Sequence, residues 1–354
     1  MPAAISSRPA VHQDQFALTL AKQTEPDAVI AYLIRRLLLF IPMAVGMVVV
    51  TFGLLLIIPG DPASVLLGQE ASPEAIERLR DSLGLNDPWY VRLWDYFANL
   101  LSGDFGTSIF QNQPVTTIIL GRLGATIELA VAALVIATVL GLAMGVISAM
   151  RQGSIIDTIT MVFAQFGVSM PVYWLSLLLM LAFAVQLGWL PAIGRGTPLP
   201  QAFWTALSGR PQVLMDSLSH LLLPALALSA TPAAIISRLT RTSMLEMLRE
   251  DFVRTAYAKG LRRPRVIIRH VLRNALLPVL SVIGLRFGML LGGAVLTESI
   301  FAWPGLGQLT ITAISQRDLP LIQGIVLTFA LIFALVNLLV DLLYAAVDPR
   351  VRLG

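Results

Sequence analysis

Long apolar stretches constrain this chain more than any other feature of its sequence. A helix that crosses a lipid bilayer needs about 20 mostly apolar residues, and six stretches of this kind alternate with polar segments. The sequence therefore predicts an all-α, polytopic membrane protein with six transmembrane helices, an external helical subdomain and a helical hairpin in one cytoplasmic loop. The expected spans are approximately 33–58, 123–150, 159–187, 221–237, 275–296 and 319–347.

The charge content supports this fold class. Only 13% of the 354 residues are charged, whereas a soluble globular protein carries about 25%. So few charges argue against a water-soluble enzyme of this size, because its surface would be largely apolar. The chain has no cysteine, and its three histidines are widely scattered. We therefore expect no disulfide, no metal site and no cofactor in this chain.

The arginine distribution orients the spans, because cytoplasmic loops carry an excess of Lys and Arg. The segment between the fourth and fifth spans contains ten basic residues and three acidic ones, whereas the segment between the first and second spans is mainly acidic. We expect the loop 239–274 inside the cell, the segment 60–118 outside, and both termini in the cytoplasm. Residues 1–30 are predicted to be a flexible tail rather than a cleaved signal peptide, and residues 31–354 the membrane domain.

The external segment carries helix signals. Ser72 precedes Pro73 in the pattern of an N-cap followed by proline at the first helical position, and Gly84 is expected to end that helix. Asp87 and Pro88 introduce a second, aromatic-rich helix. A packed external subdomain with Trp and Tyr at the membrane interface and a docking surface for an external partner both fit this pattern. A second external element, 298–307, is expected to be a short interfacial or re-entrant piece.

The cytoplasmic loop predicts two helices around a tight turn. Residues 244–259 are expected to form the first helix, which Gly260 ends. Pro264 then opens a second helix, in which Arg265, Arg269 and Arg273 recur every four residues and share one face. The positive-inside rule alone explains the charge, but it does not explain a helix–glycine–helix arrangement between two spans.

Sequence motifs in this loop resemble a known family. The run Asp251–Leu261 (DFVRTAYAKGL) resembles the cytoplasmic signature loop of ABC importer permeases, and the run RHVLRNALLP at 269–278 resembles that of the oligopeptide/dipeptide/nickel branch. The general importer pattern begins Glu-Ala-Ala, whereas this chain has Arg254 and Thr255 before Ala256, a departure that fits the peptide branch. Further matching motifs are PGDP at 59–62, LGL at 83–85, GDFG at 103–106, ATIEL at 125–129, WPGLG at 303–307 and DPR at 348–350.

The resemblance implies a partner set and a substrate class. It implies the first permease of a heterodimeric pair in a bacterial plasma (inner) membrane, with a homologous second permease, two cytoplasmic ATPases and an external substrate-binding protein. It implies di- or oligopeptides as substrates, with nickel chelates, glutathione-like peptides or sugars as alternatives. The resemblance implies no nucleic-acid partner. In this family the loop forms a coupling-helix hairpin, which here implies ATPase contacts by Arg254, Thr255, Ala256, Lys259, Gly260 and Leu261.

The two lysines exclude one role for this chain. A phosphate-binding P-loop requires Gly-Lys followed by Ser or Thr, but Lys22 precedes Gln23 and Lys259 precedes Gly260. The chain therefore lacks this nucleotide site, and we expect ATP and Mg²⁺ to bind to separate partner subunits.

Ionisable residues inside spans are functional candidates by default. Arg286 lies about 16 Å into the fifth span, near the bilayer centre, by the 1.5 Å rise of a helix. On the same helix Gly284, Gly288 and Gly292 form a stripe that favours close helix packing, and Arg286 is expected on nearly the opposite face. We interpret Arg286, together with Glu128 and Glu298, as candidate residues of a translocation pathway. A structural ion pair is an equally open interpretation of Arg286.

Two other classes of protein compete with the importer interpretation. An intramembrane zinc protease would need a His-Glu-x-x-His motif, which the chain lacks. A stand-alone secondary transporter would need coupling carboxylates near the midplane and often an inverted repeat, and neither is evident. The importer subunit is therefore the favoured hypothesis.

Overall fold

The computed structural model describes residues 38–39, 41–53, 62–68 and 71–347. Every regular element in these ranges is helical, apart from an isolated bridge between Thr107 and Pro114. The predicted all-α class is confirmed. The tail 1–30 and the motifs PGDP and DPR lie outside the described residues, except for Pro62.

Four helices in the described ranges are long and apolar enough to cross a bilayer. Three of the predicted spans lie inside longer helices, because helical structure continues past the apolar stretch into the flanking polar sequence. The four helices are α6 (Val115–Met150), α10 (Pro211–Met247), α13 (Arg273–Ile300) and α15 (Leu319–Val347). Helix α10 continues through Pro224 and Pro232, and only α15 matches its predicted bounds of 319–347.

The predicted third span, 159–187, is sharply bent in the structure. Helix α7 (Ile155–Ser169) is followed by α8 (Val172–Leu179) and the π-helix η1 (Met180–Gln186), and the two parts meet at 109°. The break falls at Met170 and Pro171, because proline has no N–H to donate and disfavours helical geometry in the residue before it. Of the predicted first span, the described part contains the apolar helix Ile41–Gly53. The structure thus bears out a multi-pass helical protein without fixing the number of spans at six.

Close packing at glycine joins α6 to α10. A Cβ atom added to Gly141 would come within 2.8 Å of the Ala233 carbonyl oxygen, and one added to Gly145 within 2.6 Å of the Ser237 carbonyl oxygen. Gly141 and Gly145 therefore serve close packing of the two helices. Beside them, buried Ala133 and Ala137 allow the same close approach along α6.

The segment predicted to be external contains three short helices, α3 (Pro62–Leu67), α4 (Pro73–Ser82) and α5 (Trp89–Leu101). The Ser72 hydroxyl accepts a hydrogen bond from the Ala75 N–H, which confirms the predicted N-cap. Gly84 adopts a φ of +64° just after α4, as a helix-ending glycine does. Helix α5 begins directly after Pro88, as predicted.

The predicted cytoplasmic helix 244–259 is interrupted. Helix α10 ends at Met247, and α11 (Asp251–Ala258) begins after Glu250, whose backbone is extended. The break allows α11 to turn back so that Val253 and Ala256 pack beside Met244. The second helix begins as α12 (Arg263–Val266), with Pro264 at its start, and continues through the π-helix η2 (Ile267–Leu272) into α13.

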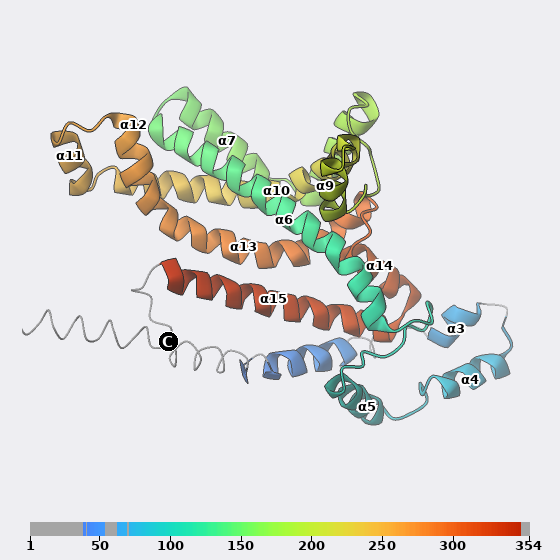
Figure 1. Cartoon of the computed structure of the whole chain (residues 1–354). Helices are drawn as coiled ribbons and strands as arrows, with labels where there is room; N and C mark the ends of the chain where they lie inside the picture. Colours follow the sequence, from blue (N-terminus) through green and yellow to red (C-terminus); the bar gives the residue numbers. More distant parts are fainter. Residues whose placement is uncertain (1–37, 40, 54–61, 69–70, 348–354) are drawn as a thin grey trace, which may run out of the picture.

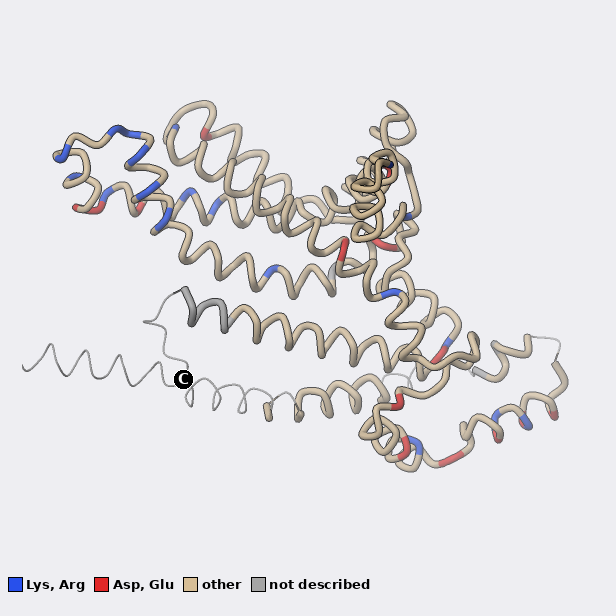
Figure 2. Tube along the Cα trace, viewed as in Figure 1, with Lys and Arg blue, Asp and Glu red and all other residues tan. Residues whose placement is uncertain are grey.

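The long helices run side by side, and the short elements gather at their two ends (Figure 1). Helices α11 and α12 lie at one end, whereas α3, α4, α5 and α14 (Leu306–Gln316) lie at the other. Figure 2 shows Lys and Arg concentrated along α11, α12 and the adjoining end of α10. The element predicted at 298–307 is the end of α13 and a turn that leads into α14.

Candidate coupling and translocation sites

Helix α11 is attached to the bundle by one face. Val253 and Ala256, three residues apart, are only 3% and 6% exposed, because positions i and i+3 lie on the same side of a helix. They belong to a cluster of buried apolar side chains that joins α11 to the ends of α6, α10 and α13 and comprises Ala149, Met244, Val253, Ala256, Val266, Ile267, Val271 and Ala275. The cluster makes α11 a firmly seated part of the bundle.

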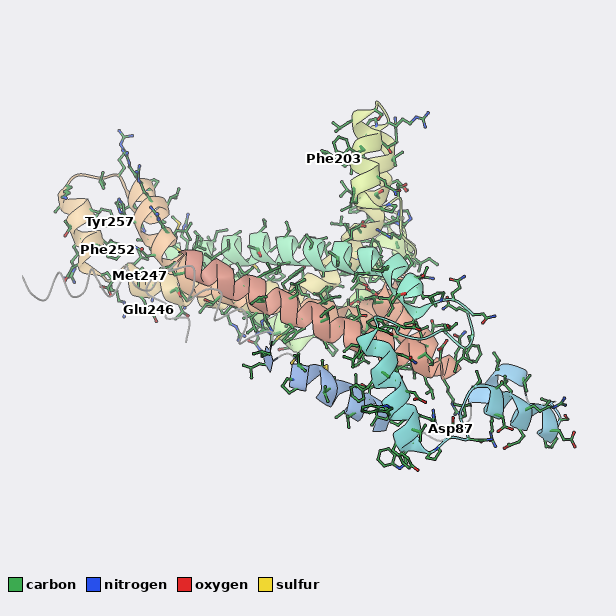
Figure 3. All side chains as sticks on the ribbon, turned by 60° about the horizontal axis from the view of Figure 1, so that its bottom comes forward. Asp87, Phe203, Glu246, Met247, Phe252 and Tyr257 are labelled. Atoms are coloured by element: carbon green, nitrogen blue, oxygen red, sulfur yellow. The ribbon has the colours of Figure 1, made fainter. Side chains whose placement is uncertain are left out.

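The opposite face of α11 is free. The residues predicted to contact an ATPase divide between the two faces: Arg254, Thr255, Lys259 and Gly260 are exposed, Leu261 is half-buried, and Ala256 is buried. Ala256 therefore positions α11 rather than presenting a contact surface in this conformation. Two aromatic side chains that the sequence prediction did not select, Phe252 and Tyr257, are 36% and 41% exposed on this helix (Figure 3).

The turn after α11 depends on a glycine. Gly260 has a φ of +77°, a left-handed conformation that favours glycine. Its N–H donates to the Tyr257 carbonyl at 2.9 Å, and the Leu261 N–H donates to the Ala256 carbonyl at 3.3 Å. A Cβ at Gly260 would meet nothing within 4 Å. Glycine is therefore required here by the backbone conformation and not by lack of space.

The predicted arginine face is present beyond this turn. Arg265, Arg269 and Arg273 are all exposed, and Val266 and Val271 are buried on the other side. In a regular α-helix a four-residue spacing drifts by about 40° per step. The wider turn of η2 reduces the angle between successive residues, which keeps the three arginines on one side.

A partly buried ion pair that the sequence did not predict lies near this loop. The Arg241 Nε and Nη2 atoms donate to the two carboxylate oxygens of Asp157, each at 2.8 Å. Asp157 also accepts hydrogen bonds from the Ser148 hydroxyl and, at 2.9 Å, from the Gly153 N–H. We call these four residues the Asp157 clasp. It ties the turn between α6 and α7 to α10.

The sequence held a partial signal for this clasp. Arg241 was counted with the loop charges that orient the chain, but it lies inside α10. Asp157 follows the N-cap residue Ser154 at the acidic first turn of α7, a position that local helix capping explains without a distant partner. Only the packing of α7 against α10 brings Asp157 and Arg241 together.

Glu128 forms an ion pair at the other end of the bundle. Its carboxylate accepts from Arg195 of the loop after η1, and the two side chains are 7% and 15% exposed. The Arg195 guanidinium also lies over the Trp303 ring, 5.5 Å from its centroid. The Trp303 Nε1 donates to the Ala125 carbonyl at 2.9 Å. The motifs ATIEL and WPGLG therefore meet in space, through an arginine that the sequence prediction missed.

Glu298 is fully buried in a network of hydrogen bonds, the outer network. Its carboxylate accepts from the Thr126 hydroxyl at 2.8 Å and from the N–H groups of Gly307 and Gln308 at 2.7 and 3.1 Å. A Cβ at Gly305 would overlap this carboxylate. In the described conformation Glu298 has no exposed surface, and its hydrogen bonds anchor the segment 301–308.

A second buried carboxylate, which the sequence prediction did not select, holds the external segment. Asp318 is 0% exposed and accepts hydrogen bonds from the Ser108 hydroxyl and from the Ile109, Phe110 and Leu321 N–H groups. These contacts join the turn before α6 to the junction between α14 and α15.

Arg286 is partly buried on α13 and lacks a carboxylate partner among the described side chains. Its Nη1 donates to the Met289 sulfur at 3.3 Å, and its Nε has no hydrogen-bond partner in the described part of the chain. On the same helix, a Cβ at Gly284 would come within 2.6 Å of Val340, and one at Gly288 within 2.9 Å of Phe333. These two glycines pack on α15 as predicted, whereas Gly292 faces open space.

Comparison with known proteins assigns this architecture to a family. Residues 138–353 match the family described as the inner membrane component of binding-protein-dependent transport systems, and residues 29–130 match its N-terminal region. The chain belongs to this family, the membrane-spanning permease subunits of ABC importers.

Close relatives carry peptide-transport names. The chain is 48% identical over 331 residues to the dipeptide transport system permease protein DppB of Alkalihalophilus pseudofirmus, an alignment covering 91% of this chain and 99% of the relative. It is 43% identical over 333 residues to the Escherichia coli K12 protein of the same name, covering 91% and 98%. It is 42% identical over 321 residues to the glutathione transport system permease protein GsiC of Pectobacterium atrosepticum, covering 91% and 98%.

A solved structure shares the fold. The MetNI methionine ABC transporter, in an inward-facing conformation, has a chain that superposes with a TM-score of 0.52 at 16% identity, covering 66% of this chain and 97% of that one. At this identity the likeness concerns the helical architecture alone.

Proposed function

We propose that this chain forms half of the translocation pathway of an ATP-driven importer of di- and oligopeptides. The names of its relatives, two of them dipeptide permeases and one a glutathione permease, support this substrate class. Nickel chelates and sugars are the alternatives within the same architecture. The observation that carries the proposal is the seating of α11, which is fixed to the bundle by one face and free on the other.

In the proposed assembly a homologous second permease completes the pathway, and two cytoplasmic ATPases supply the ATP and Mg²⁺ sites. The free face of α11 docks on an ATPase through Arg254, Thr255, Lys259 and Gly260. Because α11 shares its buried cluster with α10 and α13, a displacement of α11 passes to both helices as a rigid-body movement.

We propose that the end of the bundle with α11 is cytoplasmic, in a bacterial inner membrane, with both termini on that side. The exposed arginines of α12 and η2 support this orientation. An external substrate-binding protein then delivers peptide to the opposite end. The lack of cysteine makes the test direct: a single cysteine at Ala258 should react with an impermeant thiol reagent only in inverted vesicles, and reaction in intact cells would reverse the orientation.

Arg286 is the proposed pathway residue. A charge near the bilayer centre should not face lipid, and the described residues offer its guanidinium only a thioether. A peptide carboxylate is the ligand that a guanidinium fits best. Arg286→Met should reduce uptake while Arg286→Lys retains part of it; normal uptake by Arg286→Met at normal abundance would remove this role. Glu128, paired with Arg195, shapes the outer end of the pathway.

Affinity purification followed by an activity assay tests the whole proposal. A tagged chain should copurify with a second permease and two ATPases, and the reconstituted complex should hydrolyse ATP faster with its binding protein and a dipeptide. A panel of di- and tripeptides, glutathione, a nickel chelate and a sugar separates the substrate classes. Isolation of a chain that transports peptide alone would refute the importer assignment.

A further inference from the structure

A hairpin at the outer end of the bundle stands apart from the long helices. Helix α9 (Leu199–Leu207) leads through a short turn into the first residues of α10. We call residues 199–218 the outer arm. Figure 3 shows it as an upright rod, marked by Phe203, that projects across the direction of the long helices.

The base of the outer arm is firmly attached. The Ser217 hydroxyl donates to the Thr197 carbonyl at 2.7 Å, and Leu199 packs against the cluster that contains Leu221 and Trp303. Arg195, two residues before Thr197, is held by Glu128. The arm is therefore held at one end, and its direction is defined by the bundle.

The sides and the tip of the arm differ in polarity. Phe203, Trp204, Leu207 and Met215 are 52%, 68%, 65% and 72% exposed, so the sides offer large apolar and aromatic surfaces. The tip is polar and exposed, with Ser208, Gly209, Arg210 and Gln212. Exposed apolar and aromatic side chains grouped in this way favour contact with lipid over water. The polar tip and Asp216, whose side chain is 60% exposed, favour the level of the headgroups.

The level of the arm corresponds to a membrane boundary. Leu221, at its base, lies 20 residues before Arg241 along α10, or about 30 Å at the helical rise. A bilayer core is about 30 Å thick. With the Asp157 clasp near one boundary, the base of the arm lies near the other.

The neighbouring surface of α6 has the character of a lipid-facing helix. Val131, Val135 and Val139, spaced at about one helical turn, are 43%, 55% and 61% exposed, and in Figure 3 the arm rises on the side along which α6 runs. The exposed side chains of this stripe are all apolar, as contact with acyl chains requires.

We propose that the outer arm is an interfacial anchor that lies in the boundary between headgroups and acyl chains of the outer leaflet. Trp204 and Phe203 insert among the upper acyl chains, and the polar tip, with Arg210, remains at headgroup level. Because Glu128, Arg195 and Trp303 connect the base of the arm to α6 and α13, the anchor sets the depth of the outer network in the membrane. The proposal depends on membrane location and not on peptide transport, so failure of the uptake assay leaves it standing.

Site-directed labelling of the complete importer complex in lipid nanodiscs tests the anchor. The chain has no cysteine, so Leu207→Cys and, as a second site, Met215→Cys each give one place in this subunit for a fluorescent label once the partner subunits are cysteine-free. Lipids brominated near the headgroup should quench these labels about twofold more strongly than lipids brominated at the chain end. A label at Val135→Cys should show the reverse order, and one at Ala258→Cys no lipid quenching.

Three results would overturn the proposal. Quenching of both arm labels by aqueous iodide alone would place the arm in water, free to meet the binding protein. Cross-linking of either site to the second permease, with protection from lipid quenchers, would make it a contact between subunits. Stronger quenching by chain-end bromine than by shallow bromine at both sites would bury the arm in the bilayer core.

Discussion

The buried carboxylates at the proposed outer end of this molecule contrast with the exposed basic residues at the other end. At the outer end Glu298 and Asp318 are fully buried, and their oxygens are occupied by hydroxyl and backbone donors of the same chain. At the opposite end, which we propose is cytoplasmic, Lys259 and the arginines of α12 and η2 are exposed. A buried carboxylate is stable only when its hydrogen bonds are satisfied, and these two carboxylates find their donors within this chain. The cytoplasmic end leaves its charged groups available to a partner.

The largest expected effect comes from filling the space beside a buried carboxylate. Gly305→Ala places a methyl group where the Glu298 carboxylate lies, and we expect a loss of about 3 kcal/mol in stability from overpacking and displaced hydrogen bonds. Thermal unfolding of the detergent-solubilised complex measures it. Gly292→Ala, which meets open space, is the matched control, and equal midpoints for both variants would contradict the rigid outer network.

At the end proposed to be cytoplasmic, a change in the backbone should reduce function more than it lowers stability. Proline cannot adopt the φ of +77° of Gly260, so Gly260→Pro should disrupt the turn after α11 and reduce peptide-dependent uptake by about a hundredfold. Membrane insertion should be normal. Gly103→Pro is the control, because Gly103 has a φ of +81° and the same type of hydrogen bond at the outer end. Unchanged coupling of ATP hydrolysis to transport in Gly260→Pro would count against α11 as a coupling helix.

The Asp157 clasp should show an intermediate effect. Asp157→Asn keeps the shape of the side chain but removes the charge that Arg241 binds, and we expect a loss of about 2 kcal/mol. Arg241→Met should cost a similar amount, and the double variant should cost less than the sum of the two. Additive losses in this double-mutant cycle would show that the two groups do not interact in the complex.

The smallest effect is expected at Tyr257, an exposed side chain at the edge of the free face of α11. Tyr257→Ala removes an exposed ring and should weaken ATPase binding by about 1 kcal/mol, roughly fivefold in Kd, with no change in the stability of the chain. Val253→Ala, on the buried face of the same helix, should lower the stability of the chain and leave ATPase affinity unchanged. Solution binding of the purified ATPase to permease nanodiscs measures the first, and thermal unfolding measures the second. Equal ATPase affinity for wild type and Tyr257→Ala would show that Tyr257 lies outside the docking surface.

Local patterns accounted for much of the fold. The cap at Ser72, the turn at Gly84, the start after Pro88 and the bounds of α15 were all predicted, because each depends on neighbouring residues or on a continuous apolar run. The break at Pro171 was missed, although the proline was visible, because proline inside a spanning helix is compatible with either a mild kink or a full bend.

The candidate sites were predictable to a lesser degree. The arginine face and the turn at Gly260 follow from spacing and from the conformational freedom of glycine. The inward position of Ala256 could not be predicted from spacing, because it depends on the interruption at 248–250 that turns α11 toward Met244. The partners Arg195 of Glu128 and Arg241 of Asp157 are 67 and 84 residues distant in sequence, beyond the reach of any periodicity.

By itself the sequence determined that this chain resides in a membrane, which segments are apolar, and that it lacks a P-loop. These properties depend on composition and short-range pattern. Only the tertiary structure decided which charges are satisfied within the chain and which remain exposed, because that outcome depends on contacts between helices far apart in the sequence. Glu298 and Arg286 illustrate the difference: both are ionisable residues on α13, yet the fold buries one among donors and leaves the other with a thioether.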